Sequence, residues 1–145
     1  SRQCATASPN SPSRSRSSTE FTSARPRLSY TVINRHMDLN AYQQQALETA
    51  LYPNRGANFV YPALGLCGEA GEVADKLKKV IRDNDGCLTD EVRDNVAKEI
   101  GDCMWYVAVL AAELDYNLEE IAQGNLDKLA SRKQRGVIQG SGDSR

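Results

Sequence analysis

The sequence has a single histidine, His36, which excludes catalytic triads and zinc sites built on several histidines. It contains no Cys-x-x-Cys pair, so its four cysteines form neither a typical zinc motif nor a disulfide-dense scaffold. No apolar run reaches the roughly 18 to 20 residues that a membrane-spanning helix requires, so we expect no membrane segment. Cys67 and Cys103 lie within apolar helical patterns, where we expect small buried side chains and not reactive thiols.

Basic residues are outnumbered by acidic residues in most of the chain. The formal net charge is −1 over 145 residues, but residues 1–36 carry six arginines and one acid, whereas residues 37–145 carry twelve basic and eighteen acidic side chains. An acidic body without a basic stripe lacks the clustered lysines and arginines that bind phosphate backbones. We therefore expect no nucleic-acid partner. A chain of this length is sufficient for one domain with a sizeable core.

Residues 1–36 are rich in serine, arginine and proline and lack hydrophobic periodicity, which predicts a disordered segment. Two interpretations stay open. The segment is an organelle transit peptide, which shares this composition, or Met37 is the true start and the residues before it are untranslated sequence or an artefact. A basic arm for nucleic acid would depend on Arg14 and Arg16 alone, a weak signal. The folded domain is expected at residues 37–145.

Four segments show helical periodicity. The first begins near Leu39 and ends before Pro53, with apolar residues recurring at steps of three and four. The second covers about residues 61–82 and ends at the turn sequence DNDG. Its expected apolar stripe consists of Leu66, Val73, Leu77, Val80 and Ile81.

The other two helices have recognisable first turns. Thr89 is followed by Asp90 and Glu91, and a threonine cap and early carboxylates both stabilise the start of a helix. This third helix extends to about residue 115. Asn117 with Glu120 three residues later resembles a capping box, which predicts a fourth helix that extends to about residue 134.

No segment alternates apolar and polar residues over the length of a strand. The predicted fold class is therefore all-α, most simply a four-helix antiparallel bundle. The stretch CMWYVAVLAA of the third helix is apolar around most of its circumference, which indicates burial on several sides and favours an oligomer. Trp105 is expected either in the core or at the contact between subunits.

Two pairs of acidic residues share one spacing on neighbouring helices. Glu69 and Glu72 stand three residues apart on the second helix, and Glu99 and Asp102 repeat this spacing on the third. Residues three apart lie on one helix face, so two such pairs on packed helices would bring four carboxylates together. Their repulsion calls for cations, and oxygen-only ligands suit Mg²⁺ or Mn²⁺. The alternative is a pair of solvated helix faces, but each pair borders the apolar stripe of its helix.

These acids lie in the sequences GLCGEAGEVADKLKK and KEIGDCMWYVAVL, in which 26 residues separate Glu72 from Glu99. Together with the terminal NLDKLASRKQRGVIQGSGD, they resemble the MazG-like nucleotide pyrophosphohydrolases, a family with a Glu-x-x-Glu helix and a Glu-x-x-Asp helix. The resemblance covers the chain from about Met37 onward. It implies an all-α enzyme, working as a homodimer or homotetramer, that uses Mg²⁺ to hydrolyse nucleoside triphosphates to monophosphate and pyrophosphate. The implied metal ligands and catalytic residues are Glu69, Glu72, Glu99 and Asp102.

The resemblance also implies residues near the substrate. Tyr106, one turn after the second acidic pair, matches a position that contacts substrate in relatives, although a core aromatic is an equal alternative. Asn125 and Lys128 resemble the family's phosphate-proximal polar pair. Lys79 and Arg82 are further candidates for binding phosphate, although a solvated basic flank explains them equally well.

One position departs from the family pattern. Many members carry a further glutamate where this chain has Gly68, which puts a role of that carboxylate in activating water in doubt here. Gly65, Gly68 and Gly71 form a string at three-residue spacing inside a helical pattern. We interpret the string as a place of close helix packing and not as a phosphate-binding loop.

The predicted function is therefore Mg²⁺-dependent hydrolysis of a nucleoside triphosphate, in the service of nucleotide-pool house-cleaning. One alternative is a related pyrophosphatase that acts on phosphoribosyl-ATP. Another is a non-catalytic helical dimerisation or regulatory module that retains the acidic pairs as metal-binding groups. The expected location is the cytoplasm, or an organelle if residues 1–36 are a transit peptide.

Overall fold

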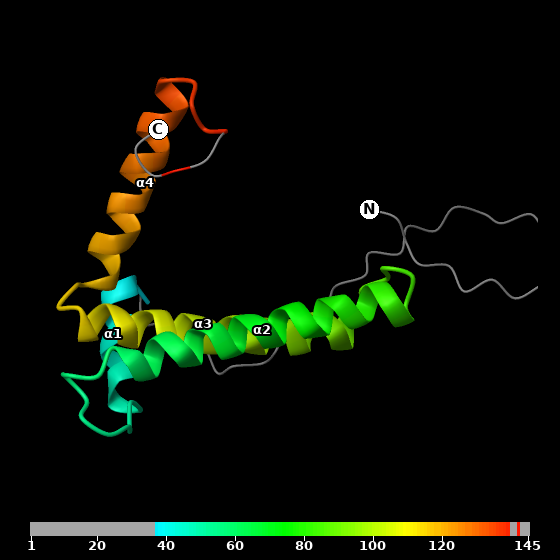
Figure 1. The fold of residues 1–145 in the computed structure, drawn as a ribbon, viewed down its shortest axis with the longest axis horizontal. Coiled ribbons are helices and arrows are strands. Elements are labelled where there is room, and N and C mark those ends of the chain that lie inside the picture. Colours follow the sequence, from blue (N-terminus) through cyan, green and yellow to red (C-terminus); the bar gives the residue numbers. More distant parts are fainter. Residues whose placement is uncertain (1–36, 140–141, 143–145) are drawn as a thin grey trace, which may run out of the picture. The chain divides into compact units, whose positions relative to one another are not determined.

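The structure is a computed structural model that describes residues 37–139 and 142. These residues form four α-helices and no strand, which confirms the all-α prediction (Figure 1). The expectation of a disordered segment at residues 1–36 lies outside the described part of the chain. Among the described helices, none combines the length and the apolar character that crossing a membrane requires.

Helix α1 comprises Leu39–Glu48 and begins at an aspartate cap. The carboxylate of Asp38 accepts a hydrogen bond of 2.6 Å from the backbone N–H of Ala41, which satisfies one free donor at the helix start. The helix ends at Thr49, before Pro53 as predicted. A loop then leads to the next helix.

Helices α2, Val60–Asp83, and α3, Asp90–Glu113, form an antiparallel pair of 24 residues each (Figure 1). In the turn between them, Asp85 and Gly86 have φ values of 48° and 76°, the left-handed region that ends many helices. The hydroxyl of Thr89 caps α3 by accepting a hydrogen bond of 3.3 Å from a backbone N–H three residues later. The predicted stop at DNDG and the predicted start after Thr89 are both confirmed.

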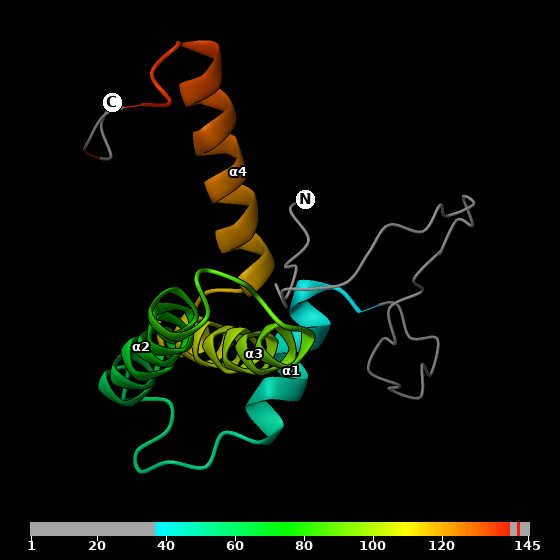
Figure 2. The same cartoon turned by 90° about the vertical axis from the view of Figure 1, so that its right-hand side faces the viewer.

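Helix α4, Leu118–Gln134, begins with the predicted capping box of Asn117 and Glu120. It contacts α1 and α3, and most of its length leads away from the α2–α3 pair (Figures 1 and 2). Asn40 of α1 holds the start of α4, because its amide donates to the Glu119 carboxylate at 2.8 Å and accepts from the Glu119 N–H at 3.3 Å.

Helix α3 contacts all three other helices and lies between α1 and α2 (Figure 2). A buried amide ties this junction together. Nε2 of Gln43 donates to the carbonyl oxygens of Ala108 and Tyr116 at 3.1 Å each, and its Oε1 accepts from the N–H of Leu118 at 3.0 Å. Around it lies a small core of Ala46, Ala108, Ala111 and Leu118, with Tyr42 and Trp105 packed against it. Trp105 therefore belongs to the core of α1 and α3, one of its two predicted locations.

Helix α2 contacts α3 alone among the described helices, so much of its surface is exposed. Of the residues that the periodicity assigns to the apolar stripe, Ile81 and Leu77 are exposed, at 73% and 37%, and those two predictions are wrong; Val80 is buried as predicted. Cys67 is exposed and not buried as expected, whereas Cys103 on α3 is half-buried. A helix with one neighbour buries only a narrow stripe, whatever its residue types.

Candidate functional site

Three carboxylates from two helices meet along the α2–α3 pair. Glu69 on α2 and Glu99 and Asp102 on α3 each place one oxygen within 4.8 Å of the others. The two acids of α3 face α2 together because residues three apart lie on one side of a helix. Glu69 and Glu99 are half-buried and Asp102 is exposed, so solvent reaches the cluster.

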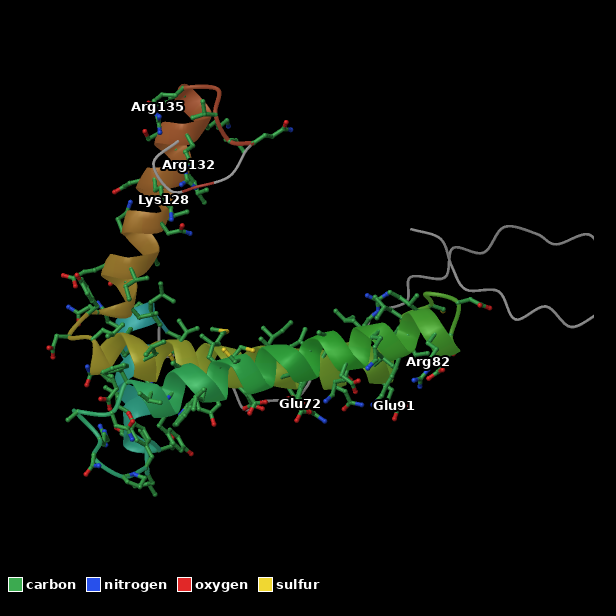
Figure 3. All side chains as sticks on the ribbon, viewed as in Figure 1. Glu72, Arg82, Glu91, Lys128, Arg132 and Arg135 are labelled. Atoms are coloured by element: carbon green, nitrogen blue, oxygen red, sulfur yellow. The ribbon has the colours of Figure 1, made fainter. Side chains whose placement is uncertain are left out.

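Glu72, the fourth acid of the predicted set, lies at the edge of this cluster. Its side chain is 63% exposed, compared with 16% for that of Glu99. Figure 3 shows Glu72 projecting from the α2–α3 pair on the side away from α4. Its carboxylate lies 3.3 Å from the Nζ atom of Lys76. The structure thus brings three of the four predicted acids together directly and connects the fourth to them through a lysine.

That lysine is not identified as a site residue by the sequence. The Nζ atom of Lys76 lies 2.9 Å from Oε1 of Glu99, as well as 3.3 Å from Oε2 of Glu72, so one ammonium group bridges carboxylates of α3 and α2. A signal was present, because Lys76 follows Glu72 by four residues and Glu69 by seven, steps that share one helix face. Only the packing of α3 against this face shows that Glu99 is the second partner.

Glu69 and Glu99 have pKa values shifted in opposite directions. Desolvation raises the pKa of Glu69, and the charge of Asp102 and a hydrogen bond with Glu99 raise it further. The pKa of Glu99 is lowered, chiefly by its hydrogen bond with Lys76. Glu99 therefore carries the charge that the ammonium neutralises, and of these two acids Glu69 more readily holds a proton.

Tyr106 lies beside the cluster, one helical turn after Asp102. Burial raises the pKa of its hydroxyl. A neighbouring tyrosine, Tyr61, with which it forms a hydrogen bond, raises this pKa further, as do the charges of Glu69 and Asp102. Its ring packs directly on the backbone of Gly65 in α2: a Cβ atom at that position would lie 2.1 Å from the ring atom Cε1. The interpretation of the glycine string as close packing is confirmed here.

The same interpretation is wrong for the other two glycines. A Cβ atom at Gly68 or Gly71 would have no neighbour within 4 Å, so both positions face open space. The charge of Asp102 also acts on helix α1: the pKa of Tyr42 is raised by burial and, second, by this carboxylate.

A loop before α2 supports this arrangement. Glu113, at the end of α3, accepts hydrogen bonds from the Tyr52 hydroxyl and from two backbone N–H groups of the loop, those of Gly56 and Asn58, at 2.8 Å each. The Tyr52 ring stacks on Tyr61 with centroids 4.7 Å apart. Tyr61 is also the hydrogen-bond partner of Tyr106, so the loop is connected to the acidic site through these two tyrosines.

The structure places the predicted pair Asn125 and Lys128 apart from the acids. Both line a largely apolar groove of about 630 Å³ between α3 and α4, together with Ile100, Met104 and Val107. In Figure 3, Lys128 lies on α4 and Glu72 projects from the opposite side of the α2–α3 pair. Within one chain, the two sets of residues therefore lie on different faces of α3.

Lys79 and Arg82 lie further along α2, toward its C-terminal end. Lys79 pairs with Asp75 at 2.6 Å, and Arg82 pairs with Asp83 at 2.6 and 2.7 Å. Lys79 also lines a hollow of about 280 Å³ between the ends of α2 and α3. The structure thus places both cations beside acids of their own helix and not in the carboxylate cluster.

A family model for the MazG nucleotide pyrophosphohydrolase domain matches residues 62–137, more than half of the chain. The chain belongs to the MazG family. This MazG chain is also similar to the "Gene 37 protein" of Mycobacterium phage L5, with 53% identity over 114 residues that cover 75% of this chain and the whole of the phage protein. No solved structure matches the chain.

The matched MazG region contains all of α3 and α4 and all but the first two residues of α2. The acidic cluster, Lys76 and the groove residues of α4 therefore lie within the MazG domain. Helix α1, whose Gln43 bonds to α3 and to the start of α4 and whose Tyr42 packs on the core, precedes the matched region.

Proposed function

We propose that this MazG protein is a magnesium-dependent hydrolase that cleaves a nucleoside triphosphate to nucleoside monophosphate and pyrophosphate, and that it clears unwanted nucleotides from the pool. The observation that supports this function is the convergence of Glu69, Glu99 and Asp102 from two helices of a MazG domain. Three carboxylates in one accessible place are suited to binding a divalent cation and, through it, a polyphosphate.

The donor set fits a hard divalent cation. The cluster offers carboxylate oxygens only, which Mg²⁺ and Mn²⁺ accept and softer metals do not prefer. Opposite ligands of one Mg²⁺ lie about 4.2 Å apart, at about 2.1 Å from the ion. The three oxygens lie within 4.8 Å of one another, so small side-chain adjustments would bring them to one ion. Glu69, Glu99 and Asp102 would hold the ion, and the exposed side chain of Glu72, which pairs with Lys76, would turn toward it as a further ligand.

The chemistry divides between the ion and the chain. Bound Mg²⁺ would neutralise charge on the polyphosphate and make a nearby water more acidic. The carboxylates of α2 and α3 fix the place at which the α-phosphorus is presented, because both helices are held by their mutual packing. The hydroxyl of Tyr106, whose raised pKa keeps it protonated, can donate a hydrogen bond to a phosphate oxygen beside the cluster.

We further propose that the protein works as a homodimer or homotetramer. The groove between α3 and α4 exposes Ile100, Met104 and Val107 at 49%, 45% and 37%, a large apolar surface for a small chain. A second copy packed on this groove would remove it from water. It would also allow α4 of one copy to approach the acids of another, which reconciles the position of Asn125 and Lys128 with a role near phosphate.

Product analysis tests the reaction. The full chain is incubated with a panel of nucleoside and deoxynucleoside triphosphates and with phosphoribosyl-ATP, with Mg²⁺ or with EDTA, and products are followed by phosphorus NMR. We expect monophosphate and pyrophosphate with Mg²⁺ and no turnover with EDTA. Release of orthophosphate would refute attack at the α-phosphorus, and turnover of phosphoribosyl-ATP alone would support the related pyrophosphatase.

Matched variants test the site. Asp102→Asn and Glu69→Gln each remove a carboxylate of the cluster, and we expect turnover to fall by roughly a hundredfold or more, since a metal ligand is lost. Asp94→Asn is the control, because Asp94 is exposed on α3 outside the cluster. Equal turnover in all three variants would refute the assignment of the site.

A further inference from the structure

One cation of the chain already occupies part of the acidic site. The ammonium of Lys76 contacts Glu99 on α3 at 2.9 Å and Glu72 on α2 at 3.3 Å. Glu99 also belongs to the three-carboxylate cluster. An oxygen that accepts from an ammonium at this distance offers less of its charge to a metal ion, and two cations that share one carboxylate repel each other. Lys76 and a divalent ion therefore compete for Glu99.

We propose that Lys76 is a tethered counterion that a divalent cation must displace, so that this lysine sets how tightly the acidic site binds metal. The inference rests on the proposed function, because it requires that the cluster binds a divalent ion. It assigns Lys76 as a positioning residue: the lysine stabilises the packing of acids from two helices and gives up Glu99 when metal binds. Carboxylates this close would otherwise repel each other across the α2–α3 contact.

The surroundings of Lys76 allow such a movement. Its side chain is 28% exposed, and it lines the hollow of about 280 Å³ that continues along α2 and α3 away from the cluster. Asn84 and Asn95 line the same hollow. The long, flexible lysine stem can therefore move the ammonium from Glu99 toward the side chains of Asn84 and Asn95 while its backbone stays in the helix.

A purely structural role for Lys76 makes a different prediction. If the lysine only cross-links α2 and α3, its removal loosens the pair and leaves metal affinity unchanged or weaker. If it competes with metal, its removal strengthens metal binding although the free protein loses stability. The direction of the change in metal affinity separates the two roles.

Mn²⁺ binding to the full chain, measured by electron paramagnetic resonance, tests the inference in four proteins. They are the wild type, Lys76→Met, Lys76→Arg and the control Lys78→Met, which removes a lysine paired with Asp75 outside the cluster. Lys76→Met should bind Mn²⁺ roughly five- to tenfold more tightly than wild type, because one positive charge next to the site is gone. Lys76→Arg keeps the charge and should remain within about twofold of wild type, as should Lys78→Met. The gain should shrink at high salt.

Each outcome is decisive. Mn²⁺ affinity of Lys76→Met equal to or weaker than that of Lys78→Met would overturn the role of Lys76 and leave the metal site intact. No binding of Mn²⁺ to the wild type would overturn the metal site itself, and the inference with it. If Lys76→Met does not fold, acylation of wild-type lysines, followed by mass spectrometry, gives the answer. Labelling of Lys76 should rise when Mg²⁺ is added while labelling of Lys78 stays constant, and constant labelling of both would refute displacement.

Discussion

Gly65 of α2 and Tyr106 of α3 pack tightly beside the acidic cluster, with the tyrosine ring occupying the space that a side chain at position 65 would need. A Cβ atom at position 65 would lie 2.1, 2.3 and 2.7 Å from three ring atoms, distances far too short for non-bonded carbons. The ring cannot move without leaving its place near Glu69 and Asp102. Gly65 therefore fixes both the approach of the two helices and the position of an aromatic group at the candidate site.

Gly65→Ala should displace Tyr106 and destabilise the protein by about 1 to 3 kcal/mol, the usual cost of overpacking a tight contact. Turnover should fall as well, because the tyrosine hydroxyl leaves the cluster. Gly68→Ala is the matched control: its Cβ atom meets nothing, and alanine favours the helix by roughly 0.5 to 1 kcal/mol. Urea unfolding of the two variants should give changes of opposite sign, and destabilisation by Gly68→Ala of the same size would contradict the packing argument.

Gln43→Ala should be among the most destabilising changes in α1. The variant removes three hydrogen bonds and leaves two carbonyl oxygens and one N–H at the junction of α1, α3 and α4 without this partner. We expect a loss of roughly 2 to 4 kcal/mol in the free energy of unfolding, from unsatisfied polar groups and a cavity. Gln45→Ala, on the exposed side of the same helix, should change it by less than about 0.5 kcal/mol. Similar effects in both variants would show that the buried amide contributes little.

The Tyr52 hydroxyl makes stability depend on pH in the alkaline range. Burial, the hydrogen bond to Glu113 and the charge of Glu113 raise the pKa of Tyr52 to about 12, above its ordinary value of 10.0. The folded state therefore favours the protonated hydroxyl, so this contribution is complete below pH 10 and is lost as pH rises toward 12. Tyr52→Phe lacks it, and the difference in unfolding free energy between wild type and variant should shrink over this range. A constant difference would contradict the assignment.

The carboxylate of Glu113 makes stability depend on pH in the acidic range, where stability is lost as pH falls. Burial alone would raise the pKa of Glu113, but hydrogen bonds from Tyr52, Gly56 and Asn58 outweigh it and lower the pKa. The stabilisation is therefore present above the ordinary pKa of a glutamate and is lost as pH falls through the lowered value. Glu113→Gln should cost about 1 to 3 kcal/mol at pH 7, the range for hydrogen bonds to a charged acceptor. Urea unfolding should show the difference between wild type and variant shrinking as pH falls below the ordinary pKa of a glutamate; a difference that stays as wide in acid as at pH 7 would refute it.

Mixing two inactive variants tests whether α4 serves the acidic site of another copy. Asp102→Asn damages the carboxylate cluster, and Lys128→Met damages the polar pair on α4, which lies on a different face of α3. If sites are shared between copies, oligomers formed from both variants contain some sites with neither change and should regain roughly a quarter of wild-type turnover. The measurement is turnover after co-refolding at equal amounts. If the mixture stays as inactive as its components, each site is built from one chain.

Local chemistry made several features predictable from the sequence. The starts of α3 and α4 follow from Thr89 and from Asn117 with Glu120, because caps are satisfied by bonds to residues three positions away. The turn sequence DNDG at residues 83–86 likewise predicts the end of α2, because aspartate, asparagine and glycine favour turns. The acidic pairs and the family resemblance also needed no tertiary information, since a spacing of three residues places two side chains on one helix face.

Packing decided which acids meet. Residues three apart on a helix still differ in direction by about 60°, and the rotation of α2 against α3 brings Glu69 to Glu99 while Glu72 turns outward to Lys76. That rotation depends on Gly65 admitting the ring of Tyr106, a contact between residues 41 positions apart in the sequence. The direction of α4, which carries Asn125 and Lys128 away from the acids, depends likewise on Asn40 and Gln43 of α1. The sequence by itself determined the helices and the groups they carry, because these depend on near neighbours; only the tertiary structure decided their partners, because helix faces are oriented by contacts between distant residues.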